Sequence, residues 1–199
     1  MEALIQLLHA VRRLSPKLEA HLRSKIKCYK FKKGTDIIKA GEVADKILYI
    51  EKGFVRSYSI VDGERASNYF MREGNIVISV ESFLEQTPAP EAIEALEYCI
   101  CWGITYDELE EAYRLFVEFN IHGRIITGKY YCQSEARHRS KHRKDPEEIY
   151  EGLIKSDPEL LRRAKGIHIA SYLNTSRATY QRLKRDYARQ KRRPPFKSV

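Results

Sequence analysis

The chain has 199 residues, of which 43% are hydrophobic and 32% are charged, and its formal net charge is +9 at pH 7. This length can bury one good core and a small second domain, and the absence of a long apolar run argues against a bilayer-spanning segment. Residues 137–199 contain 18 lysines and arginines against 7 aspartates and glutamates, whereas residues 1–136 contain 18 against 20. The basic C-terminal third indicates a polyanionic partner. An anionic membrane surface is the less favoured alternative, because the basic stretches lack a bulky apolar face.

The N-terminal stretch MEALIQLLHAVRRLS predicts an amphipathic helix. It lacks the apolar segment and cleavage site of a signal peptide, so a cytoplasmic location is expected. The four cysteines are too scattered for a disulfide framework, a zinc site or an iron–sulfur cluster. We expect reduced thiols and neither a metal nor a cofactor. The cysteines are Cys28, Cys99, Cys101 and Cys132.

Residues 29–104 alternate short β-rich runs with glycine turns. Asp62-Gly63 between SYSIV and ERASNYF is a strong hairpin signal. Several short strands in succession predict a β-sandwich or β-roll. The punctuating glycines are Gly34, Gly41, Gly53, Gly63 and Gly74.

A long helix is expected next. Thr105 and Glu108 form a capping box, and the helical pattern continues to about Arg139. A stripe of residues at alternating steps of three and four resembles a coiled-coil seam and favours a homodimer. The alternative is that the stripe packs on the chain's own β-roll. The stripe consists of Leu109, Ala112, Phe116, Phe119, Gly123, Ile126 and Tyr130.

A basic break near residue 140 separates this helix from the C-terminal region. Asp145 and Pro146 are typical of a helix start, and Asp157-Pro158-Glu159 predicts another.

The stretch from Gly166 to Arg185 predicts a helix-turn-helix. Ala170 is the small residue expected where the two helices approach, and Asn174 suits the left-handed turn. Ser176 is a good N-cap for the second helix, with its hydroxyl available to the amide of Thr179. Ile169, Leu173, Tyr180 and Leu183 recur at helical spacing and are expected to form the small core.

The outward face of the second helix is basic and polar. Arg177 and Arg182 are the candidates for base contacts, with Gln181 a third. The candidates for phosphate contacts are Ser176, Thr179 and Lys184. The alternative is a surface helix pair with solvated charge, but the small residue, the turn and the cap agree in register and favour DNA binding.

The segments KKGTDIIKAGEVADKILYIEKGFVRSY and IASYLNTSRATYQRLK, with the order of the elements, resemble the CRP/FNR family of bacterial transcription regulators over nearly the whole chain. The resemblance implies an α+β fold in three parts. Residues 1–104 would form an N-terminal helix and a jelly-roll-like, double-stranded β-roll, the cyclic-nucleotide-binding-like sensor. Residues 105–140 would form a dimerisation helix, and residues 141–199 an all-α helix-turn-helix domain with a basic tail. Double-stranded DNA, a second copy of the chain and RNA polymerase are the implied partners.

The chain departs from the family pattern in two places. The resemblance implies an effector pocket at Glu81, Ser82 and Thr127, but Ala89 and Pro90 stand where nucleotide-binding members have an arginine and a serine. A buried phosphate without a cation is costly, so we expect no tight cyclic AMP binding and an unidentified effector or none. In the recognition helix, Ala178 replaces an acidic residue that accepts from cytosine, so the operator should differ from the usual family site.

The last residues, ARQKRRPPFKSV, are expected to be a flexible arm that reaches DNA through Arg192 and Arg193, or a tail that only adds charge. The alternative function is a ligand-binding regulatory module that acts through protein partners and has only non-specific affinity for DNA. An enzyme is not expected, because the sequence has no glycine-rich phosphate loop, nucleophile motif or metal-ligand cluster.

Overall fold

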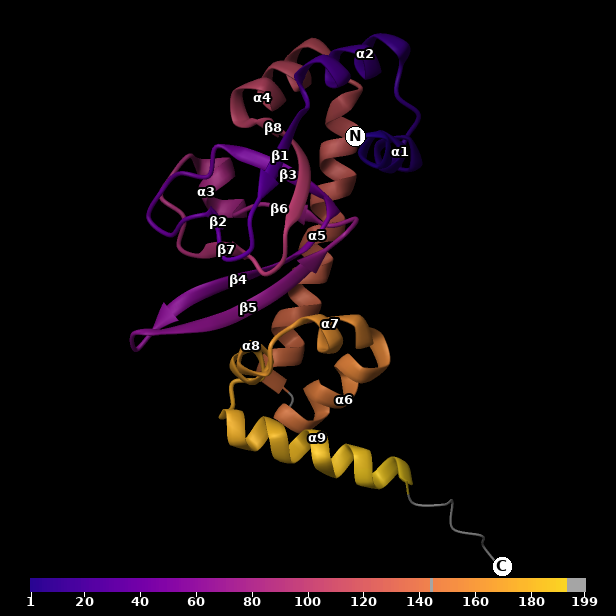
Figure 1. Ribbon diagram of the computed structural model, residues 1–199. Coiled ribbons are helices and arrows are strands. Elements are labelled where there is room, and N and C mark those ends of the chain that lie inside the picture. Colours follow the sequence, from indigo (N-terminus) through magenta and orange to yellow (C-terminus); the bar gives the residue numbers. More distant parts are fainter. Residues whose placement is uncertain (144, 193–199) are drawn as a thin grey trace, which may run out of the picture.

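The computed structural model describes residues 1–143 and 145–192. The arm assigned to Arg192 and Arg193 therefore falls outside the described side chains. A β-roll forms the middle of the molecule, short helices lie at one end, and a helical domain lies at the other (Figure 1). None of the described helices is long and apolar enough to cross a membrane.

Helix α1 (Glu2–Val11) confirms the predicted N-terminal helix, and a second helix that was not predicted, α2 (Pro16–Lys25), follows it. Ser15 caps α2 by accepting a hydrogen bond from the amide of Leu18 at 3.3 Å. The apolar faces of both helices join a buried cluster that also contains Ala112 and Phe119 from later in the chain. This cluster attaches the N-terminal helices to the rest of the molecule.

The β-roll consists of two four-stranded antiparallel sheets, with orders β1-β8-β3-β6 and β2-β7-β4-β5, which confirms the predicted fold class. At the tip of the β4–β5 hairpin, Asp62 and Gly63 have positive φ values of 51° and 80°, as a tight hairpin turn requires. The strands are β1 (Lys27–Phe31), β2 (Asp36–Ile38), β3 (Lys46–Lys52), β4 (Phe54–Val61), β5 (Glu64–Arg72), β6 (Ile76–Val77), β7 (Ala92–Ala95) and β8 (Cys99–Thr105), and α3 (Val80–Glu85) lies between β6 and β7.

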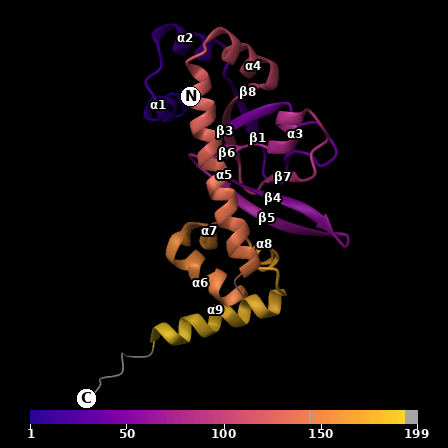
Figure 2. The same cartoon turned by 180° about the vertical axis from the view of Figure 1, so that it is seen from behind.

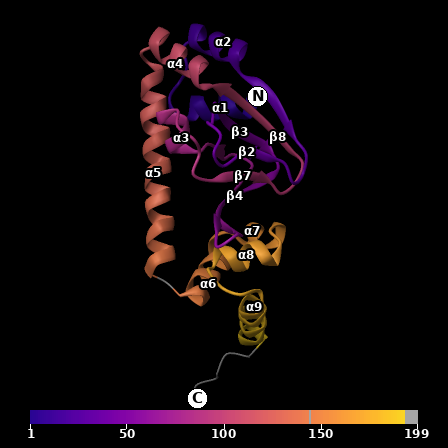
Figure 3. The ribbon, with the colours of Figure 1, turned by 90° about the vertical axis from the view of Figure 1, so that its left-hand side faces the viewer.

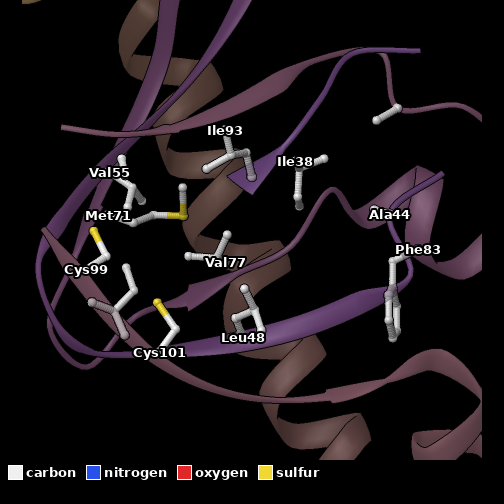
Figure 4. Close-up of a cluster of buried hydrophobic side chains, with 13 residues drawn as sticks. Ile38, Ala44, Leu48, Val55, Met71, Val77, Phe83, Ile93, Cys99 and Cys101 are labelled. Atoms are coloured by element: carbon white, nitrogen blue, oxygen red, sulfur yellow. The ribbon is translucent and has the colours of Figure 1, made fainter. Parts of the chain in front are cut away.

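The space between the two sheets is filled by aliphatic side chains, Phe83 of α3 and the thiols of Cys99 and Cys101 (Figure 4). Both cysteines are fully buried. Burial raises the pKa of the Cys101 thiol to about 12 and that of Cys99 to about 11. These thiols therefore stay protonated and act as small core residues.

The predicted single helix from Thr105 to Arg139 is wrong in one respect, because the chain forms two helices, α4 (Tyr106–Leu115) and α5 (Phe119–Arg143). The capping box of Thr105 and Glu108 is confirmed at the start of α4. The break is needed because α4 packs on α2 and β8, whereas α5 turns away and runs along the roll to the helical domain (Figure 2).

The stripe predicted as a dimer seam faces the chain's own core, but most of it packs on the N-terminal helices and only part of it on the β-roll that was the alternative. Ala112 and Phe119 are buried in the N-terminal cluster. The backbone amide of Ile76 donates to the hydroxyl of Tyr130 at 2.6 Å. Gly123 lies against Tyr113, whose hydroxyl oxygen would be only 2.4 Å from an added Cβ.

The helical domain consists of α6 (Pro146–Ser156), α7 (Pro158–Arg163), α8 (Gly166–Tyr172) and α9 (Arg177–Arg192). The predicted caps are confirmed, since Asp145 accepts from the amide of Glu148 and Asp157 from that of Leu160. Helix α5 continues to Arg143, so the connection to this domain lies slightly after the predicted hinge at residue 140.

Gly103 of β8 has no room for a side chain, because an added Cβ would lie 2.3 Å from Cδ2 of Leu48 and 2.5 Å from the carbonyl oxygen of Ile47. We expect Gly103→Ala to lower the free energy of unfolding by about 1–3 kcal/mol through overpacking, measured by urea denaturation. Gly152→Ala is the control, since its added Cβ meets nothing within 4 Å. It should be neutral or stabilising by up to about 1 kcal/mol. Equal stability of the two variants would contradict this description of the sheet.

Candidate nucleic-acid interface

Helices α8 and α9 form a helix-turn-helix with the predicted local geometry. Asn174 has a φ of 51°, the left-handed conformation expected of the turn. The amide of Thr175 donates to the carbonyl of Ala170 at 3.0 Å. Ser176 accepts from the amide of Thr179 at 3.1 Å, as predicted for the N-cap. The predicted core residues Ile169, Ala170, Leu173, Tyr180 and Leu183 are all buried.

The candidate base contacts Arg177, Gln181 and Arg182 are exposed on α9, and so is Lys184. Ser176 is also exposed, and its hydroxyl lies 3.0 Å from that of the half-buried Thr179. The fold thus brings five of the six predicted residues to the first half of α9, with Ser176 at its N-cap, and leaves their outer sides open. Their contact with DNA stays a prediction.

Two exposed arginines were missed in the sequence. Arg185 lies one turn beyond Gln181 and two turns beyond Ala178, so the three share the outer face of α9, and Arg189 follows one turn later. Steps of three and four residues from Ala178 would have identified both arginines. They extend the basic face along most of the helix.

The position of α9 leaves this face accessible. The helix lies at the end of the molecule farthest from the N-terminal helices and runs across the direction of α5 (Figure 1). Seen from the side, α9 appears end-on below the roll, and nothing else of the described chain lies beyond it (Figure 3).

The orientation of α9 depends on contacts between α8 and the β4–β5 hairpin. Arg56 of β4 is only 3% exposed, and its guanidinium donates to Glu94 at 3.0 Å and to the hydroxyl of Ser67 at 3.1 Å. It also lies 2.7 Å from Nδ1 of His168 in α8. Because arginine has no acceptor, Nδ1 of His168 must accept, and the imidazole is neutral with its proton on Nε2. The backbone amide of Ser67 completes the contact by donating to Ser171 at 2.8 Å.

A second ionic contact joins the roll to α7. Arg163 donates to Glu73 at 2.7 Å and to Glu97 at 2.7 Å, and its guanidinium lies 5.0 Å from the centre of the Phe54 ring. The hydrogen bond from Arg163 lowers the pKa of Glu73 to about 2. Arg72 and Asp157 form a further ion pair between the same two parts. The helical domain is therefore held on the roll at two separated places.

Of the three residues assigned to the effector pocket, one is used by the fold. Ser82 is fully buried and serves the fold, since it accepts from the amide of Ala44 at 2.8 Å and donates to the carbonyl of Thr87 at 2.6 Å. Glu81 and Thr127 are exposed. A cavity of about 470 Å³ lies elsewhere in the roll, lined by β1, β2 and the loop to β3.

The contact between Arg56 and His168 predicts a pH dependence of stability. Burial, with Arg56 beside it, lowers the pKa of His168 to about 4 from an ordinary value of 6.5. Between these values the unfolded chain binds a proton that the folded chain does not, so this group costs stability as the pH falls from 6.5 to 4. The slope it contributes is at most about 1.4 kcal/mol per pH unit.

We expect His168→Asn to remove that part of the slope, because the asparagine oxygen takes the place of Nδ1 as the acceptor from Arg56 and does not titrate. Urea denaturation at several pH values measures the slope, and His138→Asn, at an exposed histidine of α5, is the control that should keep it. An unchanged slope in His168→Asn would contradict the assigned protonation state.

Comparison with known proteins agrees with this architecture. Residues 29–115 match the family model described as "Cyclic nucleotide-binding domain". No curated protein matches the chain. Many solved structures do.

FixK2 from Bradyrhizobium japonicum is 20% identical, with a TM-score of 0.71 over 87% of this chain and 89% of that one. A putative regulator of the CRP/FNR family from Eubacterium rectale is 14% identical, with a TM-score of 0.68 over 89% of this chain and 85% of that one. The regulator CLP of Xanthomonas campestris is 14% identical, with a TM-score of 0.67 over 89% of this chain and 93% of that one. Residues 29–115 thus match a cyclic nucleotide-binding domain, and the chain has the fold of the CRP/FNR regulators that its sequence resembles.

Proposed function

We propose that this chain is a sequence-specific, DNA-binding transcription regulator that acts as a homodimer and catalyses no reaction. One observation carries the proposal: helix α9 presents an exposed outer face rich in arginine and lysine at the end of the molecule, and its other face is buried in a helix-turn-helix core. A major groove admits an α-helix of this kind. RNA polymerase is the protein partner that such a role implies.

The residue types on α9 suit base recognition. Arg177 and Arg182 have the planar, bidentate donors that match the N7 and O6 atoms of guanine. Ala178, which lies between them on the outer face, offers a methyl group and no acceptor, and an apolar side chain of this size suits a thymine methyl. Lys184 and Arg185 carry charges suited to phosphates. Guanine and thymine contacts within each half-site are therefore the specificity we propose.

A second copy of the chain fits the outer face of α5. This side lies at the edge of the molecule, with no other described element over it (Figure 3). Ile125 and Tyr131 are 39% and 67% exposed. Gly128 is informative because an added Cβ would meet nothing within 4 Å. A glycine inside a helix is unfavourable by about 1 kcal/mol, and the described chain supplies no reason for it, whereas close approach of a partner helix does.

Pairing of two α5 helices side by side would place both α9 helices at the same end of the dimer. Each would read one half-site, and a two-fold axis along α5 requires a palindromic operator with half-sites about one helical turn, or 34 Å, apart. The roll needs no cyclic nucleotide in this proposal, since Ala89 is 3% exposed and packed into the core where the family pattern has an arginine.

Single substitutions on α9 test base recognition. On a duplex selected by the protein from a random library, Arg182→Ala should lose about 1–3 kcal/mol of discrimination at one base pair of each half-site. Lys184→Ala should weaken binding to all sequences alike and reduce the salt dependence, because it removes a phosphate contact. Fluorescence anisotropy on specific and scrambled duplexes measures both. Lys155→Ala, on the exposed surface of α6, is the control. If Arg182→Ala weakens binding to the specific and the scrambled duplex equally, the assignment of Arg182 to a base contact is wrong, and a module with only non-specific affinity for DNA is favoured.

A large side chain at position 128 tests the proposed dimer interface on α5. Gly128→Leu should raise the dimer dissociation constant by about ten- to a hundredfold through overpacking between copies, measured by sedimentation, while the protomer stays folded. Gln133→Leu, at an exposed position of α5 that lies about 140° around the helix from Gly128, is the control. A short bismaleimide should also join two copies through the exposed Cys132, one turn beyond Gly128, and Cys132→Ser but not Cys28→Ser should abolish the cross-link. A dimer unaffected by Gly128→Leu would place the interface elsewhere.

A further inference from the structure

A carboxylate group lies at the centre of a polar cluster in the β-roll. Glu91 immediately precedes β7, which pairs with β4. Its carboxylate accepts hydrogen bonds from the hydroxyl of Ser57 at 2.6 Å, the amide of Asn68 at 3.3 Å and the hydroxyl of Tyr69 at 3.4 Å. Strands β4 and β5 thus direct three donors at one anionic group.

The backbone is irregular at this point, and the irregularity serves the cluster. Ser57 pairs with Tyr69, but the next residue, Tyr58, pairs with Ser67, so Asn68 is the extra residue of a β-bulge. Bulges redirect side chains and are common beside binding sites. Here the bulge lets two successive side chains, those of Asn68 and Tyr69, reach the same carboxylate from one strand.

The donors are neutral, which is how a protein binds an anion without an ion pair. Among the described residues, no lysine or arginine forms an ion pair with Glu91. Ser57 is fully buried. Burial raises the pKa of the Tyr69 hydroxyl, which therefore keeps its proton and donates. The cluster has the composition of a small carboxylate-binding site whose ligand belongs to the chain.

The cluster also touches the parts that position α9. The guanidinium of Arg137 in α5 lies 5.1 Å from the centre of the Tyr69 ring, and its charge acts on Tyr172 of α8 as well. Phe70, next to Tyr69 in β5, lies 5.6 Å from the Tyr172 ring. The roll, α5 and the helix-turn-helix therefore meet beside the Glu91 site.

We propose that the Glu91 side chain is a tethered ligand: it occupies a carboxylate-binding site formed by Ser57, Asn68 and Tyr69, and so holds the roll in its DNA-reading arrangement without an external effector. The part that concerns DNA rests on the proposed function. The binding of a carboxylate at this site does not.

Chemical rescue tests the site. Glu91→Ala removes the atoms of one acetate ion and leaves the three donors in place. In chloride, the variant should melt about 3–8 °C lower than the parent, because buried donors lose their acceptor, and it should bind the selected duplex about tenfold more weakly. Replacing chloride by acetate at equal ionic strength should restore most of both losses. Glu85→Ala, at an exposed carboxylate of α3, should show neither the loss nor the rescue.

A second variant keeps the test decisive. Glu91→Gln fills the same space, so it should melt below the parent and show no response to acetate. If Glu91→Ala folds only in acetate, the proposal stands. It is overturned if Glu91→Ala matches the parent in chloride, if acetate restores nothing or fails to permit folding, or if Glu91→Gln responds to acetate equally.

The two readouts separate this inference from the proposed function. Acetate-dependent melting involves no DNA. If the chain selects no DNA sequence, the proposed regulator function is refuted, and the melting experiment alone decides whether Glu91 occupies a carboxylate-binding site. A chain that selects a sequence but shows no acetate effect would refute the tethered ligand alone.

Discussion

The buried guanidinium of Arg56 is the interaction on which the arrangement of this molecule depends. A buried charge is costly unless partners surround it, and removing one partner leaves the charge uncompensated. Here the partners come from three places: Glu94 on the neighbouring strand, Ser67 across the hairpin and His168 in the helix-turn-helix. The arginine is therefore fully satisfied only when the helical domain is docked on the β4–β5 hairpin. The direction in which α9 points follows from that docking.

The joint between the two parts is both apolar and polar. Phe54, Phe70 and Leu96 of the roll pack into the apolar core of the helical domain. The polar part includes Arg163 of α7, which binds Glu73 and Glu97 of the roll much as Arg56 binds its partners. Apolar contact tolerates sliding, but charge-assisted hydrogen bonds fix direction and distance. The polar contacts are thus suited to setting the orientation of a reading helix. The Glu91 cluster lies on the same hairpin, so one pair of strands carries both the joint and the site that we propose to stabilise it.

Local features of the fold could be predicted from the sequence because neighbouring residues determine them. Asn174 in the turn, Ser176 at the start of α9 and Thr105 at the start of α4 behave as expected, since a cap or a left-handed turn involves residues three or four apart. The core of the helix-turn-helix was predicted for the same reason. The exposed positions on α9 follow from the helical period of 3.6 residues. The same period also identifies Arg185 as exposed.

Features that join distant segments could not be predicted in this way. A stripe at steps of three and four shows that one helix face is buried but not what buries it, so Phe119 and Tyr130 were assigned to a second copy although they pack on their own chain. Arg56 and His168 are 112 residues apart, and Glu91 lies 34 residues from Ser57. Nothing in their immediate neighbours marks them. The structural role of Ser82 was not predicted either, because Ala44, whose amide donates to it, is 38 residues away in the sequence.

Selection of bound duplexes from a random-sequence library, by the purified chain without added ligand, tests the central claim most directly. The account predicts an enriched, two-fold symmetric motif with half-sites one helical turn apart, recovered equally well with and without cyclic nucleotide. Recovery of no motif, or of a motif only when a nucleotide is present, would contradict it.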